Sequence, residues 1–125
     1  MPELQIRPTI ASDLSRLMGF DHSVTSETVW QLELRRDTGQ VTATFREVRL
    51  PRSISVTYPH NPFALPDDWV RRSMMYTASI GQDPAGYISL LERGIDAVVS
   101  VTDLVVNLAN RRQGVGSALL AAAQE

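Results

Sequence analysis

The sequence predicts one domain of the α/β (α+β) class, with a mixed, mostly antiparallel central sheet flanked by helices. The 125 residues, 43% of them hydrophobic, are enough to build one core and too few for two. Apolar and polar residues alternate with the period of a strand in several segments, whereas apolar residues recur with the period of a helix near the amino terminus and the chain ends in helix-forming residues. We therefore expect residues 1–125 to fold as a single unit.

The amino-terminal segment predicts a strand followed by a helix. Leu4 to Arg7 alternates apolar and polar side chains and leads into a proline, as a short strand before a turn does. Over residues 11–20 the period changes, because Leu14, Leu17 and Met18 recur at helical spacing. A first helix is expected there.

A second helix is predicted between Ser26 and Gly39. Serine is a preferred residue at the start of a helix, and glycine commonly follows the last turn. Val29, Trp30 and Leu34 would fall toward one side of this helix. The segment is therefore interpreted as helical.

A hairpin and a loop are predicted next. Alternation over residues 41–50 and 54–58 is interrupted at Pro51, which predicts two strands with the turn at that proline. The stretch from Pro59 to Trp69 holds three prolines, and residues before proline favour extended geometry. We expect an ordered loop in this stretch.

Three strands follow that loop. Met74 to Ile80 and Tyr87 to Leu91 predict a hairpin around the turn-forming residues Gly81 to Gly86. Gly94 is expected to turn the chain into a strand from Ala97 to Val106.

The last of these strands is predicted to have two covered faces. Strict alternation places four residues on the first face: Val99, Val101, Asp103 and Val105. It places the other four on the second face: Ser100, Thr102, Leu104 and Val106. From Gly114 onward the chain is rich in alanine and leucine, which predicts a final helix.

Composition excludes several classes of function. The formal net charge is −2, so nucleic acid and anionic membranes are not expected partners. Cysteine is absent and only His22 and His60 are present, so no metal site is expected. All twelve basic residues are arginine, which excludes Schiff-base chemistry and a phosphate-binding P-loop lysine. The amino terminus lacks the features of a signal peptide and no stretch is apolar enough to span a bilayer, so we expect a cytoplasmic protein.

The junction around Arg111, Gly114 and Gly116 carries the main functional signal. A strand leads into a glycine-containing turn, and the turn opens a helix. The start of a helix exposes unpaired amide groups and the positive end of its dipole. Glycines let the backbone approach a ligand closely. Such a place is suited to bind a phosphate group.

This junction resembles motif A of the GNAT family of N-acetyltransferases, whose signature is arginine or glutamine, two residues, glycine, one residue, and glycine or alanine. The resemblance implies the GNAT fold and acetyl-CoA as co-substrate, with an amine acceptor, small molecule or peptide, attacking the thioester directly. It implies that consecutive backbone amides hold the pyrophosphate of coenzyme A: those of Arg112, Gln113, Gly114, Val115, Gly116 and Ser117. It further implies that the pantetheine arm lies along the edge formed by Leu104, Val105 and Val106.

Two alternatives compete with an active acetyltransferase. The glycines also resemble the start of a dinucleotide-binding motif, but Leu119 occupies the place of its third glycine and no acidic residue follows at the required distance. The second alternative is a coenzyme-A-binding, structural or protein-interaction module of the same fold that catalyses nothing. Sequence does not choose the acceptor.

GNAT domains normally continue past this helix into a further strand, a further helix and a closing hairpin. The chain is therefore expected to be either a shortened form of a full enzyme or a naturally short protein; its final helix-forming residues favour the former. The strand from Ala97 to Val106 would then keep an unpaired edge, which tends to recruit another chain. We expect self-association, as a homodimer or otherwise.

The catalytic residues are left unassigned by the sequence. Asp103 and Glu92 are candidate general bases, although both are more often structural carboxylates. Three aromatic residues and one histidine that lie near one another in the sequence could line an acceptor pocket: Tyr58, His60, Phe63 and Trp69. Covering the edge of a core is the commoner role of such residues. His22 is expected in a loop between helices, with no chemistry.

Overall fold

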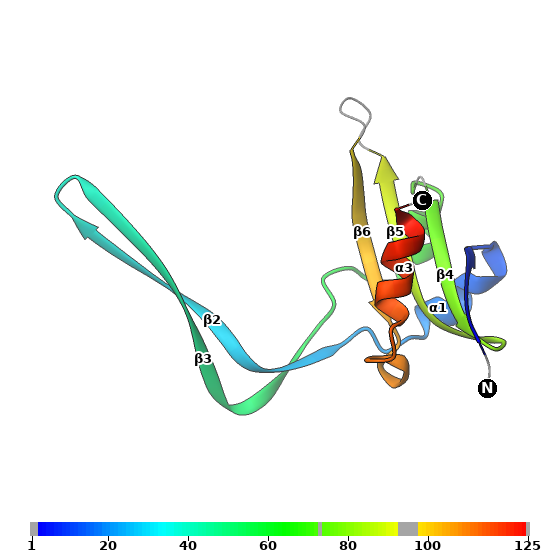
Figure 1. Cartoon of the computed structure of the whole chain (residues 1–125), viewed down its shortest axis with the longest axis horizontal. Helices are drawn as coiled ribbons and strands as arrows, with labels where there is room; N and C mark the ends of the chain where they lie inside the picture. Colours follow the sequence, from blue (N-terminus) through cyan, green and yellow to red (C-terminus); the bar gives the residue numbers. More distant parts are fainter. Residues whose placement is uncertain (1–2, 73, 93–97, 125) are drawn as a thin grey trace. The chain divides into compact units, whose positions relative to one another are not determined.

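A computed structural model describes residues 3–72, 74–92 and 98–124 (Figure 1). The chain forms two compact units. The sheet unit comprises Met1–His22 and Pro59–Glu125, and the ribbon unit comprises Ser23–Tyr58. Each unit is described by itself below.

In the described part of the sheet unit, four strands lie in the order β1-β4-β5-β6, each antiparallel to its neighbours. The strands are β1 (Leu4–Pro8), β4 (Met74–Ile80), β5 (Asp83–Glu92) and β6 (Val99–Val106). The described helices are α1 (Leu14–Met18), α2 (Leu65–Trp69) and α3 (Val115–Ala123), together with the short 3-10 turns η1 (Ala11–Asp13), η2 (Pro62–Ala64) and η3 (Leu108–Asn110). These elements confirm the mostly antiparallel sheet flanked by helices.

Most predicted elements of the sheet unit are confirmed. The first strand is β1, the first helix is η1 with α1, and the final helix is α3. The hairpin β4–β5 has a tighter turn than expected, because β5 begins at Asp83 and Ala85 is an extra residue in its register with β4. The turn at Gly94 lies outside the described residues.

The stretch predicted as a loop from Pro59 to Trp69 instead contains η2 and α2. Its prolines do not prevent this, since Pro62 and Pro66 occupy first-turn positions, where a helix needs no amide hydrogen. The side chain of Asn61 caps η2 by accepting a hydrogen bond from the Phe63 amide at 3.0 Å.

The ribbon unit overturns two predictions. The segment between Ser26 and Gly39, predicted as a helix, belongs to strand β2 (Val24–Asp37), which pairs along its length with β3 (Gln40–Val56). Trp30 and Leu34 are four residues apart, a spacing that places two side chains on one side of a helix and equally on one face of a strand. Gly39, with φ 73°, forms the hairpin turn instead of ending a helix.

The predicted turn at Pro51 is also wrong, because β3 continues through it. Between Ser26 and Thr28 of β2, the register jumps from Ile54 to Arg49 of β3. Pro51 lies in that irregular part, where its missing amide hydrogen removes no regular ladder bond.

One face of the ribbon is apolar. Leu32 pairs with Phe45 and Leu34 with Ala43, and Trp30 precedes them on the same face. The side chains are nonetheless exposed: Trp30 and Phe45 are each 66% accessible.

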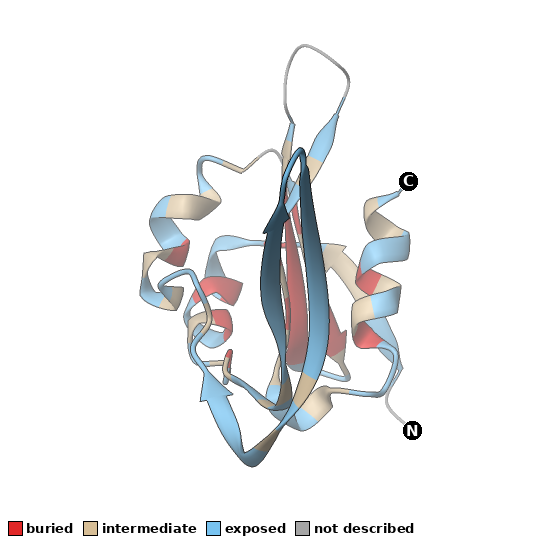
Figure 2. Ribbon diagram, turned by 90° about the vertical axis from the view of Figure 1, so that its left-hand side faces the viewer, coloured by how far each residue is buried: buried red, intermediate tan, exposed pale blue. Residues whose placement is uncertain are grey.

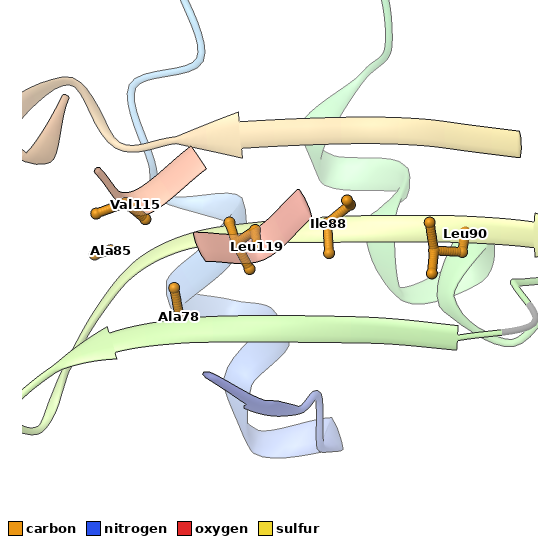
Figure 3. Close-up of a cluster of buried hydrophobic side chains, with 6 residues drawn as sticks. All are labelled: Ala78, Ala85, Ile88, Leu90, Val115 and Leu119. Atoms are coloured by element: carbon orange, nitrogen blue, oxygen red, sulfur yellow. The ribbon is translucent and has the colours of Figure 1, made fainter. Parts of the chain in front are cut away.

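Each face of the sheet in the sheet unit carries its own core. Figure 2 shows α3 on one side of the sheet, with α1 and α2 on the other. Beneath α3 lies a buried cluster: Ala78, Ala85, Ile88, Leu90, Val115 and Leu119 (Figure 3). The start and the direction of α3 are therefore set by packing against β4 and β5. A second buried set belongs to the side of α1 and α2: Leu14, Leu17, Leu65 and Met75.

An ion pair fixes the connection from β1 to α1. The two terminal nitrogens of Arg7 each contact one carboxylate oxygen of Asp13 at 2.6 Å, and the Ile10 amide donates to the same carboxylate at 2.9 Å. The hydrogen bonds from Arg7 are the largest cause that holds the pKa of Asp13 below its ordinary value.

Asp13→Asn is therefore expected to destabilise the protein at neutral pH, by on the order of 1 kcal/mol because Arg7 is partly exposed. The folded pKa of Asp13 is lower than the unfolded pKa, so the stabilisation is present above the unfolded value and is lost as pH falls through the folded one. Thermal unfolding of both proteins across acidic pH should show the difference shrinking toward low pH. A difference that stays constant with pH would contradict this account.

Candidate functional site

The loop from β6 into α3 is held by the motif arginine. Arg111 Nε donates to the Val106 carbonyl at 2.8 Å, and one terminal nitrogen donates to the Asp21 carbonyl at 3.0 Å. The side chain thus ties the loop to the end of β6 and to the segment that follows α1. Its observed role is to position the loop; contact with coenzyme A stays a prediction.

Two residues in left-handed geometry shape this loop. Arg112 has φ 65° and Gly114, immediately before α3, has φ 86°. No described atom lies within 4 Å of a Cβ built on Gly114, so the space in front of it is open. A Cβ on Gly116 would lie 3.7 Å from Val106 Cγ2, which is an ordinary contact.

The start of α3 has the amide geometry expected for an anion site. The Ala118 amide donates to the Gly114 carbonyl at 3.0 Å, so the amides of Val115, Gly116 and Ser117 precede the first intrahelical bond. These amides stand at the positive end of the nine-residue helix dipole. The Val115 side chain is buried, so only its backbone faces the loop, whereas Arg112, Gln113 and Ser117 are exposed.

Alternate residues at the end of β6 turn their backbone groups to opposite edges of the strand. The Asn107 amide donates to the Ala85 carbonyl at 2.8 Å. The residue two positions earlier therefore also turns its backbone amide and carbonyl toward β5. Val105 is that residue. Leu104 and Val106 turn theirs to the opposite edge, where no other described strand pairs with β6. A ligand on that edge would reach the backbone of Leu104 and Val106, with Val105 facing β5.

A bulge in β6 aims Asp103 away from α3. Asp103 pairs with Ser89 but Val101 pairs with Leu90, so Thr102 is an extra residue. Val101 therefore shares the face of Leu90 and the α3 core. The prediction that Val99, Val101, Asp103 and Val105 share one face is wrong, as strict alternation cannot cross a bulge. Coverage of both faces is also incomplete, since Val99 and Val101 are about half exposed.

Asp103 is the centre of a polar cluster on the side of α1 and α2. Its carboxylate is buried, with Oδ1 2.7 Å from His60 Nδ1. Ser89 Oγ donates to Oδ2 at 3.2 Å, and a terminal nitrogen of Arg72 lies 3.8 Å from the same oxygen. The sequence had singled out Asp103 and His60 separately; the fold brings them together across 43 positions.

His22 and Tyr87 form a second buried contact on this side. His22 Nδ1 is 2.8 Å from the Phe20 carbonyl, which only accepts, so Nδ1 carries the proton. When the ring is neutral, Tyr87 therefore donates its hydroxyl hydrogen to His22 Nε2, at 2.9 Å. Burial first, and then the negative charge of Asp103, raises the pKa of Tyr87 and keeps it protonated. The expectation that His22 lies between two helices is wrong, because β2 follows it.

Other candidate residues are not gathered at this cluster. Glu92 is exposed and pairs with Val99. It lies three positions along β5 from Ser89, toward the end of the β5–β6 pair that is farther from the loop into α3. Phe63 is 77% accessible. Tyr58 belongs to the ribbon unit.

The described residues contain no group of three or more His, Asp or Glu side chains placed to hold a metal ion. Among the helices in the described ranges, none is long and apolar enough to cross a membrane.

Comparisons with known proteins agree with this geometry. The Acetyltransferase (GNAT) family matches residues 41–125. Nourseothricin acetyltransferase has a similar structure, with TM-score 0.73 and 26% identity over 96% of this chain and 64% of its own. A structure described as a streptothricin acetyltransferase from Bacillus anthracis str. Ames, with acetyl coenzyme A, gives TM-score 0.67 and 22% identity over 98% of this chain and 66% of its own.

Diaminobutyrate acetyltransferase from Paenibacillus lautus, with L-2,4-diaminobutyric acid and coenzyme A, gives TM-score 0.56 and 21% identity over 100% of this chain and 58% of its own. The chain thus spans 64%, 66% and 58% of the length of these three proteins, which is less than two thirds in each case. No curated protein sequence matches it. The family match covers more than half of the chain and includes the loop and α3, so this chain belongs to the GNAT acetyltransferase family.

Proposed function

We propose that this protein transfers an acetyl group from acetyl-CoA to an amine acceptor by direct attack. The observation that carries the proposal is the junction from β6 through the left-handed Gly114 to the amides that begin α3. Bound acetyl-CoA would supply the activated acetyl group as a thioester.

The residues present fit coenzyme A. The amides of Arg112 to Ser117 would hold its pyrophosphate, with Gly114 leaving open space and Arg111 fixing the loop. Leu104 through its outward backbone groups, and Val106 through its amide, would hydrogen-bond the pantetheine arm, since the Val106 carbonyl already accepts from Arg111. Val105 would contribute through the strand it fixes against β5.

A small-molecule amine is the acceptor class that we propose. One similar structure holds diaminobutyric acid, a small amine. On the described side of α1 and α2, the exposed imidazole of His60, held by the buried carboxylate of Asp103, is suited to a polar acceptor. Turnover of amines in the presence of acetyl-CoA tests this class directly.

Gly116→Ala is expected to leave the protein folded and to change acetyl-CoA binding little. The added methyl meets only an ordinary contact with Val106 inside the fold, and the family signature accepts alanine at this position. Calorimetric titration with acetyl-CoA measures the change. Wild-type protein that is folded and shows no binding would contradict the proposed cofactor site.

Gly114→Ala is expected to weaken acetyl-CoA binding by on the order of tenfold, because the methyl enters the open space in front of the loop and adds strain at φ 86°. Gly39→Ala is the matched control, because Gly39 has φ 73° and open space around it but lies in the turn of the ribbon. Equal loss of binding in both variants would assign the effect to strain, and binding retained only in the Gly39 variant supports the site. Binding without turnover of any amine would favour a non-catalytic module.

A further inference from the structure

We propose that His60 is the general base of the reaction and that Asp103 positions it to remove a proton from a cationic amine acceptor. An alkyl amine is an ammonium ion at neutral pH, and the ammonium nitrogen has no lone pair with which to attack a thioester. Acetyl transfer to such an acceptor therefore requires a group that takes its proton. The role of His60 rests on the proposed acetyl transfer, and the experiment below separates the two.

The contact between the two side chains fixes the tautomer of the imidazole. The Asp103 carboxylate accepts hydrogen bonds, so the 2.7 Å contact places a proton on His60 Nδ1. In the neutral ring, Nε2 then carries the lone pair. When Nε2 takes a proton, the negative charge of Asp103 stabilises the imidazolium that forms.

Exposure assigns different tasks to the two residues. The Asp103 side chain is 6% exposed, and Ser89 and Arg72 hold its second oxygen. It is therefore a fixed positioning residue. The His60 side chain is 51% exposed, so its ring is reachable from solvent while its inner nitrogen is held.

The position of Asp103 along β6 places this pair near the reacting end of the cofactor edge. The pyrophosphate site lies beyond Val106, and the arm would run back along β6 toward Leu104. Asp103 is the next residue, one strand step of about 3.3 Å further. The bulge at Thr102 turns its side chain to the side of α1 and α2, where His60 lies. Glu92 fails this test, since it lies toward the far end of the β5–β6 pair.

Protons and electron pairs balance in this reaction without any further reactant. His60 Nε2 takes one proton from the acceptor ammonium, and the freed amine forms a bond to the acetyl carbonyl carbon. The carbon–sulfur bond breaks and its electron pair leaves with sulfur. The second proton lost by nitrogen protonates the thiolate, and His60 returns its proton to solvent. The products are the N-acetyl amine, free thiol and one proton.

The first readout does not depend on activity. Nitrogen-15 NMR of the wild-type protein is expected to show His60 as the Nδ1–H tautomer when neutral, and Asp103→Asn is expected to reduce that preference. Glu92→Gln is the matched control and should leave the His60 signals unchanged. An Nε2–H tautomer in the wild type would overturn the proposal.

The second readout is turnover with acetyl-CoA and two probe nucleophiles. With L-2,4-diaminobutyrate, a cationic amine, His60→Gln is expected to lower kcat/KM at neutral pH by on the order of 100-fold, a usual size for general-base catalysis. With hydroxylamine, which is already neutral, the same variant should react nearly as fast as wild type. His60→Ala should regain part of its activity when imidazole is added.

The binding of acetyl-CoA distinguishes the two proposals. Calorimetry should give the same affinity for wild type and His60→Gln, because the side chain that His60 contacts is Asp103, which is not a predicted cofactor residue. Equal loss for both nucleophiles, or an unchanged rate with the amine, would overturn the role of His60 while the cofactor site stands. Wild-type protein that binds acetyl-CoA but acetylates neither probe would also count against it, whereas failure of wild type to bind acetyl-CoA would overturn the proposed function itself.

Discussion

Leu119→Ala is expected to lower the free energy of unfolding by about 2–5 kcal/mol, the range found when a fully buried leucine is truncated. Leu119 is 0% exposed and lies where α3 packs against β4 and β5 (Figure 3). Removing its side chain leaves a cavity that the strands cannot close, because they are paired on both sides. Chemical denaturation followed by circular dichroism measures the loss.

Leu120→Ala is the matched control, since Leu120 is the next residue of the same helix and is 40% exposed. It should change stability by well under 1 kcal/mol. The acetyl-CoA affinity of Leu119→Ala should fall as well, because α3 carries the anion site on its first turn. Similar stability of the two variants would show that α3 is not anchored by this cluster.

The parts of the fold that could be predicted from sequence are those whose signals are local. Strand β1, the β4–β5 hairpin and α3 have periodicity and turn residues within a few positions of one another, and the structure confirms them. The ribbon could not be predicted from such signals. A spacing of four residues between Trp30 and Leu34 fits a helix and a strand alike, and the partner that decides, β3, begins after Gly39.

The two halves of the candidate site differ in the same way. The loop around Arg111 and Gly114 is one short stretch of chain, so its residue types and spacing indicate its geometry. The contact between His60 and Asp103 joins residues 43 apart and depends on the bulge at Thr102. No local sequence pattern indicates that Thr102 is an extra residue in β6. Strict alternation therefore assigned Val99 and Val101 to the same face as Asp103, which is incorrect.

Gly86→Ala is the substitution expected to affect both the stability and the site. A Cβ at Gly86 would lie 2.7 Å from the Val105 carbonyl oxygen, and 3.1 and 3.3 Å from side-chain carbons of Val115 and Leu119. The first distance is to backbone of the paired strand, so β5 and β6 must separate or α3 must move. Overpacking of this kind typically costs about 1–3 kcal/mol.

Gly19→Ala is the control for Gly86→Ala, because its Cβ would meet the Arg16 carbonyl at 3.5 Å, an ordinary contact. That variant should be nearly as stable as wild type in the same denaturation experiment. Gly86 pairs with Val106, and its added Cβ would contact Val115 in the first turn of α3. The folded Gly86→Ala protein should therefore also bind acetyl-CoA more weakly than the folded wild type. Normal affinity in a destabilised Gly86→Ala protein would mean that the loop keeps its geometry without close packing of β5, β6 and α3. Weakened affinity would mean that this glycine holds the strand edge and the helix start at the separation that the cofactor site needs.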